Sequence, residues 1–213
     1  MLSRSRTYVR QDPDKDAKLF LIFCEGSKTE PKYFNYFNLL NSRIRIEAVP
    51  ADSQGNNSPS GLMDSAMLAI VKSKDNPNPE YELNAEDEVW FVIDTDQWGA
   101  KIDKLRADAA NFNWQVAQSN PCFEVWLYYH FYDVSPSFSG HEQSSNWKPE
   151  LAKLINGGFH LSKHPIFIQT AIEYAKKNFT DINVASCTEV HILAERFISL
   201  IKTEIDGALA QLP

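Results

Sequence analysis

Strand-like runs alternate with helical patterns through the first two thirds of the chain, and this alternation constrains the fold more than any other feature. The strand-like runs cover 18–24, 43–49, 89–94 and 112–119. Apolar residues at helical spacing cover 29–40, 62–71, 101–110 and 121–132. Alternation of this kind predicts a mostly parallel sheet flanked by helices, with functional side chains at the carboxyl ends of the strands. We therefore expect an α/β fold with four strands.

Three of these segments carry the clearest local signals. The unbroken apolar run before Asp94 is bracketed by acidic residues and should be a central strand. Thr29 is placed to cap a helix whose first turn contains Pro31. Asn120 is placed in the same way to cap a helix that begins at Pro121.

The rest of the chain divides into an arm and an extension. Residues 1–17 form a basic N-terminal arm, since Arg4, Arg6 and Arg10 occur there without an acid in the first ten residues. We expect a core over 18–132 and a mainly helical extension over 133–213 packed on that core. In the extension, 133–150 is loop-like, and helical patterns cover 149–156, 165–178 and 190–212.

Composition excludes several classes of protein. With 213 residues, of which 43% are hydrophobic, the chain can bury a core and is not expected to be disordered. No apolar run reaches the roughly 18 residues that a membrane span needs, and no secretory signal is evident, so we expect a cytoplasmic protein without membrane association. The 21 basic and 28 acidic residues leave a net charge of −7, which argues against binding nucleic acid through an overall positive field.

Acidic residues follow two of the expected strands directly. Glu25 ends the first apolar run, and Asp94 and Asp96 end the third. In extended chain, residues i and i+2 point to the same side, so Asp94 and Asp96 can converge at the sheet edge. A carboxylate cluster persists if protons or a divalent cation neutralise it, and oxygen ligands favour Mg²⁺ or Mn²⁺. An acid after a strand is also common turn chemistry, so the spacing alone leaves both interpretations open.

A third acidic position lies in the segment SNPCFEVWLYYHF, beside two polar residues. Glu124 falls in the first turn of the expected helix, where the helix dipole favours an acid for stability alone. The same helix end directs free N–H groups toward the strand-end crevice. Ser119 and Asn120 are placed either to contact metal-bound water or phosphate, or to cap the helix, and both roles use the same geometry.

Three segments resemble, in order, the blocks of a known family. They are LIFCEGSKTEPKYF, VIDTD and SNPCFEVWLYYHF, and a weaker fourth block is ASCTEVHILAERF. Together they resemble the RloB family of bacterial proteins. That family is similar to the Toprim nucleases and is associated with phage-defence gene pairs whose other member is an ATPase.

The resemblance implies a Toprim-like core and a role for each matching acid. Glu25 would be a metal ligand or a general acid/base, and Asp94 and Asp96 would be the metal-binding pair. Glu124 would be a ligand of a second metal ion.

The resemblance also points to residues near substrate. Gly26 would let the backbone approach phosphate, and Lys28 would offset developing charge. Glu30 lies in the same block, but a role in the first turn of the helix explains it equally well. Some Toprim nucleases also supply a basic residue from the C-terminal part. No motif identifies one here, and Lys163 is the candidate.

These implications lead to two hypotheses about function. In the first, the chain is an Mg²⁺- or Mn²⁺-dependent nuclease that cleaves RNA or DNA and acts with an ATPase partner in anti-phage defence by abortive infection. In the second, it is a regulatory or binding module of an ATPase complex with little activity of its own. Exposed aromatic surface on 35–40 or on the C-terminal helices would support the second hypothesis.

Overall fold

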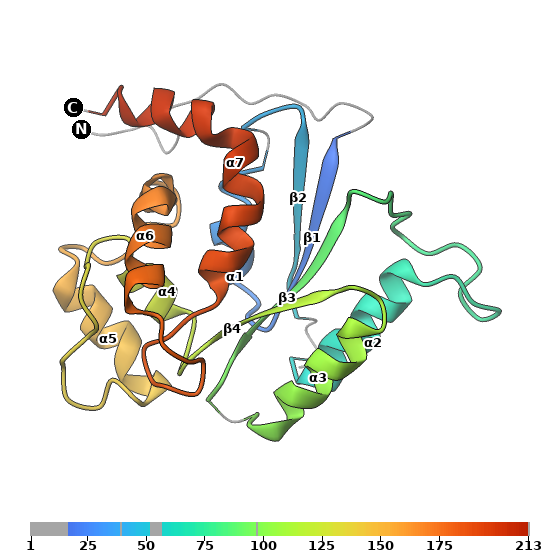
Figure 1. Ribbon diagram of the computed structural model, residues 1–213, viewed down its shortest axis with the longest axis horizontal. Coiled ribbons are helices and arrows are strands. Elements are labelled where there is room, and N and C mark those ends of the chain that lie inside the picture. The colour runs from blue at the N-terminus through green and yellow to red at the C-terminus, as the bar shows by residue number, and fades with distance from the viewer. Residues whose placement is uncertain (1–16, 39, 52–56, 97, 213) are drawn as a thin grey trace.

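A computed structural model describes residues 17–38, 40–51, 57–96 and 98–212 (Figure 1). Of the basic arm expected over 1–17, all but Ala17 lies outside the described residues. The strands and helices in chain order are β1 Lys18–Cys24, α1 Thr29–Phe34, β2 Ile44–Val49, α2 Pro59–Ile70, β3 Glu88–Asp94, α3 Ala100–Ala110, β4 Gln115–Ser119, α4 Glu124–Tyr128, α5 Ser144–Leu154, the 3₁₀ helix η1 His164–Phe167, α6 Ile168–Asn178 and α7 Val190–Leu209.

The four strands form one sheet in the order β2-β1-β3-β4, and every neighbouring pair is parallel. The expected α/β architecture is confirmed, with β3 in the centre. Because all four strands run the same way, their carboxyl ends meet at one edge. Cys24 pairs with Val92 and Asp94 pairs with Ser119, so the segments that follow β1, β3 and β4 leave the sheet as neighbours.

Each face of the sheet packs against its own helices because strand residues alternate between faces. In β1, Phe20 and Ile22 belong to one hydrophobic cluster, whereas Leu19, Leu21 and Phe23 belong to the other. Helices α2 and α3 cover the second cluster, and α1, α4, α6 and α7 lie on the opposite side (Figure 1). The sheet is therefore the middle layer of three.

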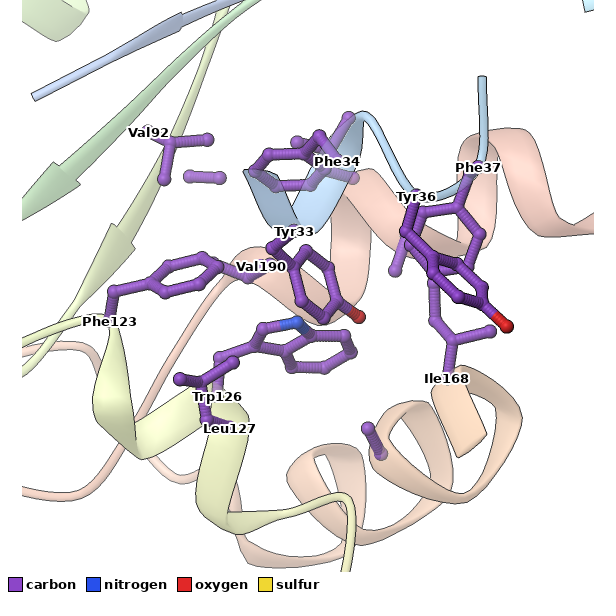
Figure 2. Packing of buried hydrophobic residues seen from close by; sticks show 14 of the residues in the cluster. Tyr33, Phe34, Tyr36, Phe37, Val92, Phe123, Trp126, Leu127, Ile168 and Val190 are labelled. Atoms are coloured by element: carbon purple, nitrogen blue, oxygen red, sulfur yellow. The ribbon is translucent and has the colours of Figure 1, made fainter. Parts of the chain in front are cut away.

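Tyr33 organises the larger cluster (Figure 2). Its ring lies edge-on to Phe37, Phe123 and Trp126, with centroids 5.5, 5.6 and 6.2 Å away. Its hydroxyl is 3.0 Å from Nε2 of His130, so the buried oxygen also has a polar partner. Aromatic pairs of this geometry contribute about 0.5–1.5 kcal/mol each beyond the area they bury. These contacts fix α1 against α4, at the carboxyl edge of the sheet.

The helical C-terminal part belongs to the same cluster. The expected long helix near the C-terminus is confirmed as α7, whose apolar side includes Phe197, 5.9 Å from the ring of Phe20 in β1. Within the described part of the chain, no helix combines the length and apolar character that a membrane crossing requires.

Helix boundaries differ from the sequence-based expectation in three places. The first helix begins at Thr29, with Lys28 as its N-cap residue instead of Thr29, and it ends at Phe34 instead of continuing to residue 40. Residues 35–38 form a turn. Its tight turn hydrogen bonds, such as Phe37 N–H to the Phe34 carbonyl at 3.0 Å, bring Phe37 into the core. The expected loop over 133–150 contains the start of α5, where Trp147 is buried against Tyr128. Tertiary packing overrides the local pattern in both cases.

The third difference concerns the helix expected from Pro121. Asn120 does not cap it, because the Asn120 side-chain amide donates to the carbonyl of Ile182 at 2.9 Å. The helix α4 begins instead at Glu124, with Phe123 as its N-cap residue, and ends at Tyr128. Glu124 still occupies the first turn, as expected.

Candidate functional site

A cavity of about 510 Å³ opens at the carboxyl edge of the sheet. The segment after β1, the start of α1, the end of β3 and the start of α4 all line it. Four acidic residues contribute to the lining: Glu25, Glu30, Asp94 and Glu124. The lysines in the lining are Lys28 and Lys148. Acidic residues from four separate segments therefore converge on one cavity, as the strand-end argument predicted for Glu25 and Asp94.

Two hydrogen bonds hold Glu25 in place. Its Oε2 accepts from the backbone N–H of Asp94 and its Oε1 from Nε1 of Trp98, both at 2.8 Å. Burial raises the pKa of Glu25 to about 7, with Asp96 and Glu30 adding repulsion that the two hydrogen bonds offset only in part. At neutral pH, this carboxyl group is therefore able both to bind and to release a proton.

Glu30 is the acid that sequence reasoning assigned equally to a helix turn. It is 7% exposed, and its carboxylate occupies the space above Gly26, where a Cβ would overlap it. Burial raises the pKa of Glu30, and repulsion from Glu124 raises it further. Gly26 therefore makes room for a carboxylate in this structure, whereas the resemblance implied an approach to phosphate. In the sequence, only its position in the KTEP block indicated that Glu30 lies near the site.

Asp94 and Asp96 occupy different surroundings. Asp94 lines the cavity, and burial raises its pKa well above the usual range, with further repulsion from Glu25, Glu30 and Glu124. Asp96 is exposed, and its Oδ2 accepts from the Ser144 hydroxyl at 3.2 Å. The strand ends at Asp94, and a turn closes from Thr95, whose carbonyl accepts from Trp98 N–H at 3.1 Å. The extended spacing assumed for the pair is lost there, so Asp96 is not among the cavity-lining residues.

Glu124 and Lys148 form the side of the cavity nearest α5. Glu124 is 6% exposed, and its Oε1 lies 3.7 Å from Nζ of Lys148. Lys148 itself is largely exposed, so its charged end is able to move. Lys28 also lines the cavity, whereas Lys163, the candidate from sequence, lies in the turn before η1 and is not part of the lining. No sequence signal pointed to Lys148, because its approach depends on how α5 packs.

Ser119 and Asn120 serve the framework beside the cavity. The Ser119 hydroxyl lies 2.8 Å from that of Thr188, and both residues are buried. Asn120 binds the carbonyls of Ile182, through its side chain, and of Cys187, through its backbone N–H, both at 2.9 Å. Both residues thus tie the end of β4 to the segment before α7, and neither lines the cavity.

The donor chemistry of the cavity suits a hard divalent cation. Carboxylate oxygens are the ligands that Mg²⁺ and Mn²⁺ prefer, and the raised pKa values of Glu25 and Asp94 indicate that their negative charges lack sufficient compensation. Among the described residues, no three His, Cys, Asp or Glu side chains are gathered closely enough in their present conformations to hold a metal ion. Binding a cation would therefore require side-chain rotation.

Comparison with known proteins places the chain in a family. No curated protein and no solved structure matches it. A family model described as RloB-like protein matches residues 20–197, which include every acidic residue that lines the cavity. The chain therefore belongs to the RloB-like family.

Proposed function

We propose that the chain is a metal-dependent nuclease that hydrolyses phosphodiester bonds in RNA or DNA, with a Toprim-like core. One observation carries the proposal: Glu25, Glu30, Asp94 and Glu124 line a single cavity at the carboxyl edge of a parallel sheet. Ligand and catalytic sites of open α/β sheets lie at this edge. Acids whose pKa values are raised by burial and by one another are common at functional sites.

Three acids would hold the divalent cation. Glu25 and Asp94 at the strand ends, and Glu124 across the cavity, would bind Mg²⁺ or Mn²⁺, and Asp96 would extend this set from the exposed side. Such a cation supplies charge neutralisation and, in nucleases, activation of water or stabilisation of the leaving oxygen. Because the pKa values of Glu25 and Asp94 are raised, binding of the cation by these groups would strengthen as the pH rises and they lose their protons.

Glu25 is the group best suited to proton transfer in the alternative arrangement in which Asp94, Asp96 and Glu124 hold the cation without it. Its pKa of about 7 is close to the pH of most cells, where general acid–base catalysis is most effective. The hydrogen bonds from Trp98 and from the Asp94 backbone fix the orientation of its carboxyl group. Lys28 and Lys148 would attract a phosphate to a cavity that is otherwise acidic.

The test is cleavage of total RNA, tRNA and plasmid DNA by purified protein, with and without Mg²⁺ or Mn²⁺. Cleavage should require the metal and should be lost in the Asp94→Ala/Asp96→Ala double variant. Asp103→Ala, at an exposed acid in α3, is the matched control and should cleave normally. Metal-dependent cleavage retained by the double variant would refute the proposal.

The defence role rests on the family resemblance. We propose that the nuclease acts in the cytoplasm with an ATPase partner in anti-phage defence. Cells that carry both genes should survive phage challenge as a population, and the Asp94→Ala/Asp96→Ala variant should remove that protection. The alternative of a regulatory or binding module would be supported by exposed aromatic surface on 35–40 or on the C-terminal helices. Tyr36 and Phe37 in the first of these segments are buried, so that segment does not supply such support.

A further inference from the structure

A second, apolar cavity adjoins the acidic one. It has a volume of about 210 Å³, and Thr29, Glu124 and Lys148 line both cavities. The remaining lining is largely apolar: Leu127, Leu151, Ala152, Phe159 and Leu161. The two cavities thus adjoin at these three residues, and Lys148 lies at this junction. No step of the proposed hydrolysis uses the apolar cavity.

The walls of the apolar cavity are held in place by the fold. Leu127 projects from α4, which packs against Tyr33 through Trp126 (Figure 2). The ring of Phe159 lies edge-on to His130 and His164, with centroids 5.0 and 5.2 Å away. Gly158 has a φ of +77°, which favours glycine and turns the chain from α5 toward Phe159. A preformed apolar cavity costs little conformational entropy when a rigid ligand enters it.

The size and polarity of this cavity select a class of ligand. Pockets that enclose drug-sized ligands measure roughly 300–1,000 Å³, so this smaller cavity suits a single flat ring system. An aromatic residue beside aliphatic side chains offers the stacking contact that nucleobases use in single-stranded complexes. The cation at the junction, Lys148, adds a partner for a phosphate attached to the same nucleotide.

We propose that the apolar cavity binds one unpaired nucleobase, while Lys148 binds the phosphate of that nucleotide at the junction with the acidic cavity. This inference rests on the proposed nuclease function and deepens it by naming the substrate class. A base within a duplex is stacked and paired, and it enters a side cavity only if it is extruded. The preferred substrate is therefore single-stranded nucleic acid, or a loop whose bases are unpaired.

The experiment measures binding without turnover. A short single strand containing 2-aminopurine is titrated into the full chain at low salt in EDTA, and fluorescence reports the environment of the base. The comparison ligands are the same strand in a duplex and an all-abasic strand of equal length, whose affinity is measured by competition with the fluorescent strand because it carries no base. We expect the wild type to bind the base-bearing single strand about tenfold more tightly than either comparison ligand, because one stacked base contributes this much.

Two variants assign that preference to the cavity. Ala152→Trp places a large side chain in the cavity from an exposed position on α5, and Ala107→Trp, exposed on α3, is the matched control. Ala152→Trp should bind the base-bearing and abasic strands equally, whereas Ala107→Trp should behave as wild type. Lys148→Ala should weaken the binding of both strands by a similar factor, since both carry phosphates.

Each outcome has a distinct meaning. Equal wild-type affinity for single strand and duplex, or an Ala152→Trp variant that keeps the wild-type preference, would overturn the base-binding inference. Neither result would bear on the proposal of metal-dependent cleavage. Conversely, base-dependent binding by a protein that cleaves nothing in Mg²⁺ or Mn²⁺ would remove the nuclease proposal and leave the base site standing.

Discussion

The two ends of β3 carry acids in opposite electrostatic surroundings. At the amino end, Oε1 of Glu88 lies 2.7 Å from Nζ of Lys18 and 2.7 Å from Nη2 of Arg196. Burial alone would raise the pKa of Glu88, but hydrogen bonds from Arg196, Lys18 and Trp90 outweigh it and lower the pKa. At the carboxyl end, Asp94 lies among other acids, and its pKa is raised. At the amino end of β3, basic residues balance the charge of Glu88. At the carboxyl end, other acids repel the charge of Asp94.

From this difference we expect Glu88 to contribute to stability and the acids around Asp94 to contribute to function. The ion pairs of Glu88 link the beginnings of β1 and β3 to α7, so they support the fold. The acids around Asp94 repel one another, and a chain optimised for stability alone would avoid this arrangement. Acids in such surroundings are common at functional sites, so their convergence supports the proposal that the cavity binds a positive ligand or handles protons. The predictions below test this division from the largest expected effect to the smallest.

The largest effect is expected for Glu25→Gln. This variant keeps the shape of the side chain and one of its two acceptor oxygens, but it removes proton transfer and the negative charge. Loss of a general acid or base typically slows a reaction by roughly 10²–10⁴-fold. Initial rates of nucleic-acid cleavage at saturating Mg²⁺ should fall within that range.

The matched control for this variant is Glu88→Gln, which makes the same chemical change at the amino end of β3, whereas Glu25 follows β1 and contacts Asp94 at the carboxyl end of β3. It should cleave at the wild-type rate at temperatures where it remains folded, because Glu88 contacts Lys18 and Arg196 and lies outside the cavity. If Glu88→Gln lost cleavage as severely as Glu25→Gln, the two ends of β3 would not be functionally distinct.

The sequence predicted the sheet better than it predicted the site. Apolar runs specify buried strands locally, so β1 and β3 were located from the residues alone. The spacing of Asp94 and Asp96 assumed an extended chain, and this assumption failed where the turn begins at Thr95. Lys148 was missed because it reaches the cavity only through the packing of α5, which buries Trp147 against aromatic residues distant in the sequence.

A smaller effect is expected in the pH dependence of stability. The pKa of Glu25 is raised from an ordinary value of 4.5 to about 7, so the folded state binds its proton more tightly than the unfolded state. The free energy of unfolding should therefore fall as the pH rises from 4.5 to 7, by about 3 kcal/mol from this group. Urea denaturation in EDTA should show this decline in the wild type and a flatter profile in Glu25→Gln.

Glu88 should show the opposite sign. Its pKa is lowered in the folded state, so its contribution is present above the ordinary value of 4.5 and is lost as the pH falls through the folded pKa. The Glu88→Gln variant should therefore lose stability chiefly above that value. If the free energy of unfolding of the wild type rose between pH 4.5 and 7, and matched the profile of Glu25→Gln, the pKa of Glu25 would not be raised in the folded state.

The smallest effects are expected for the two candidate lysines, Lys148 in the cavity lining and Lys163 outside it. Lys148→Met should slow cleavage roughly fivefold, since an exposed cation contributes at most about 1 kcal/mol through a screened interaction. Lys163→Met should leave the rate unchanged, because Lys163 lies outside the cavity. Raising the salt concentration should reduce the difference between Lys148→Met and wild type, because salt screens exposed charges. The reverse ranking of the two variants would instead place the functional cation in the turn before η1, as the sequence suggested, and would mean that this turn moves toward the acids when substrate binds.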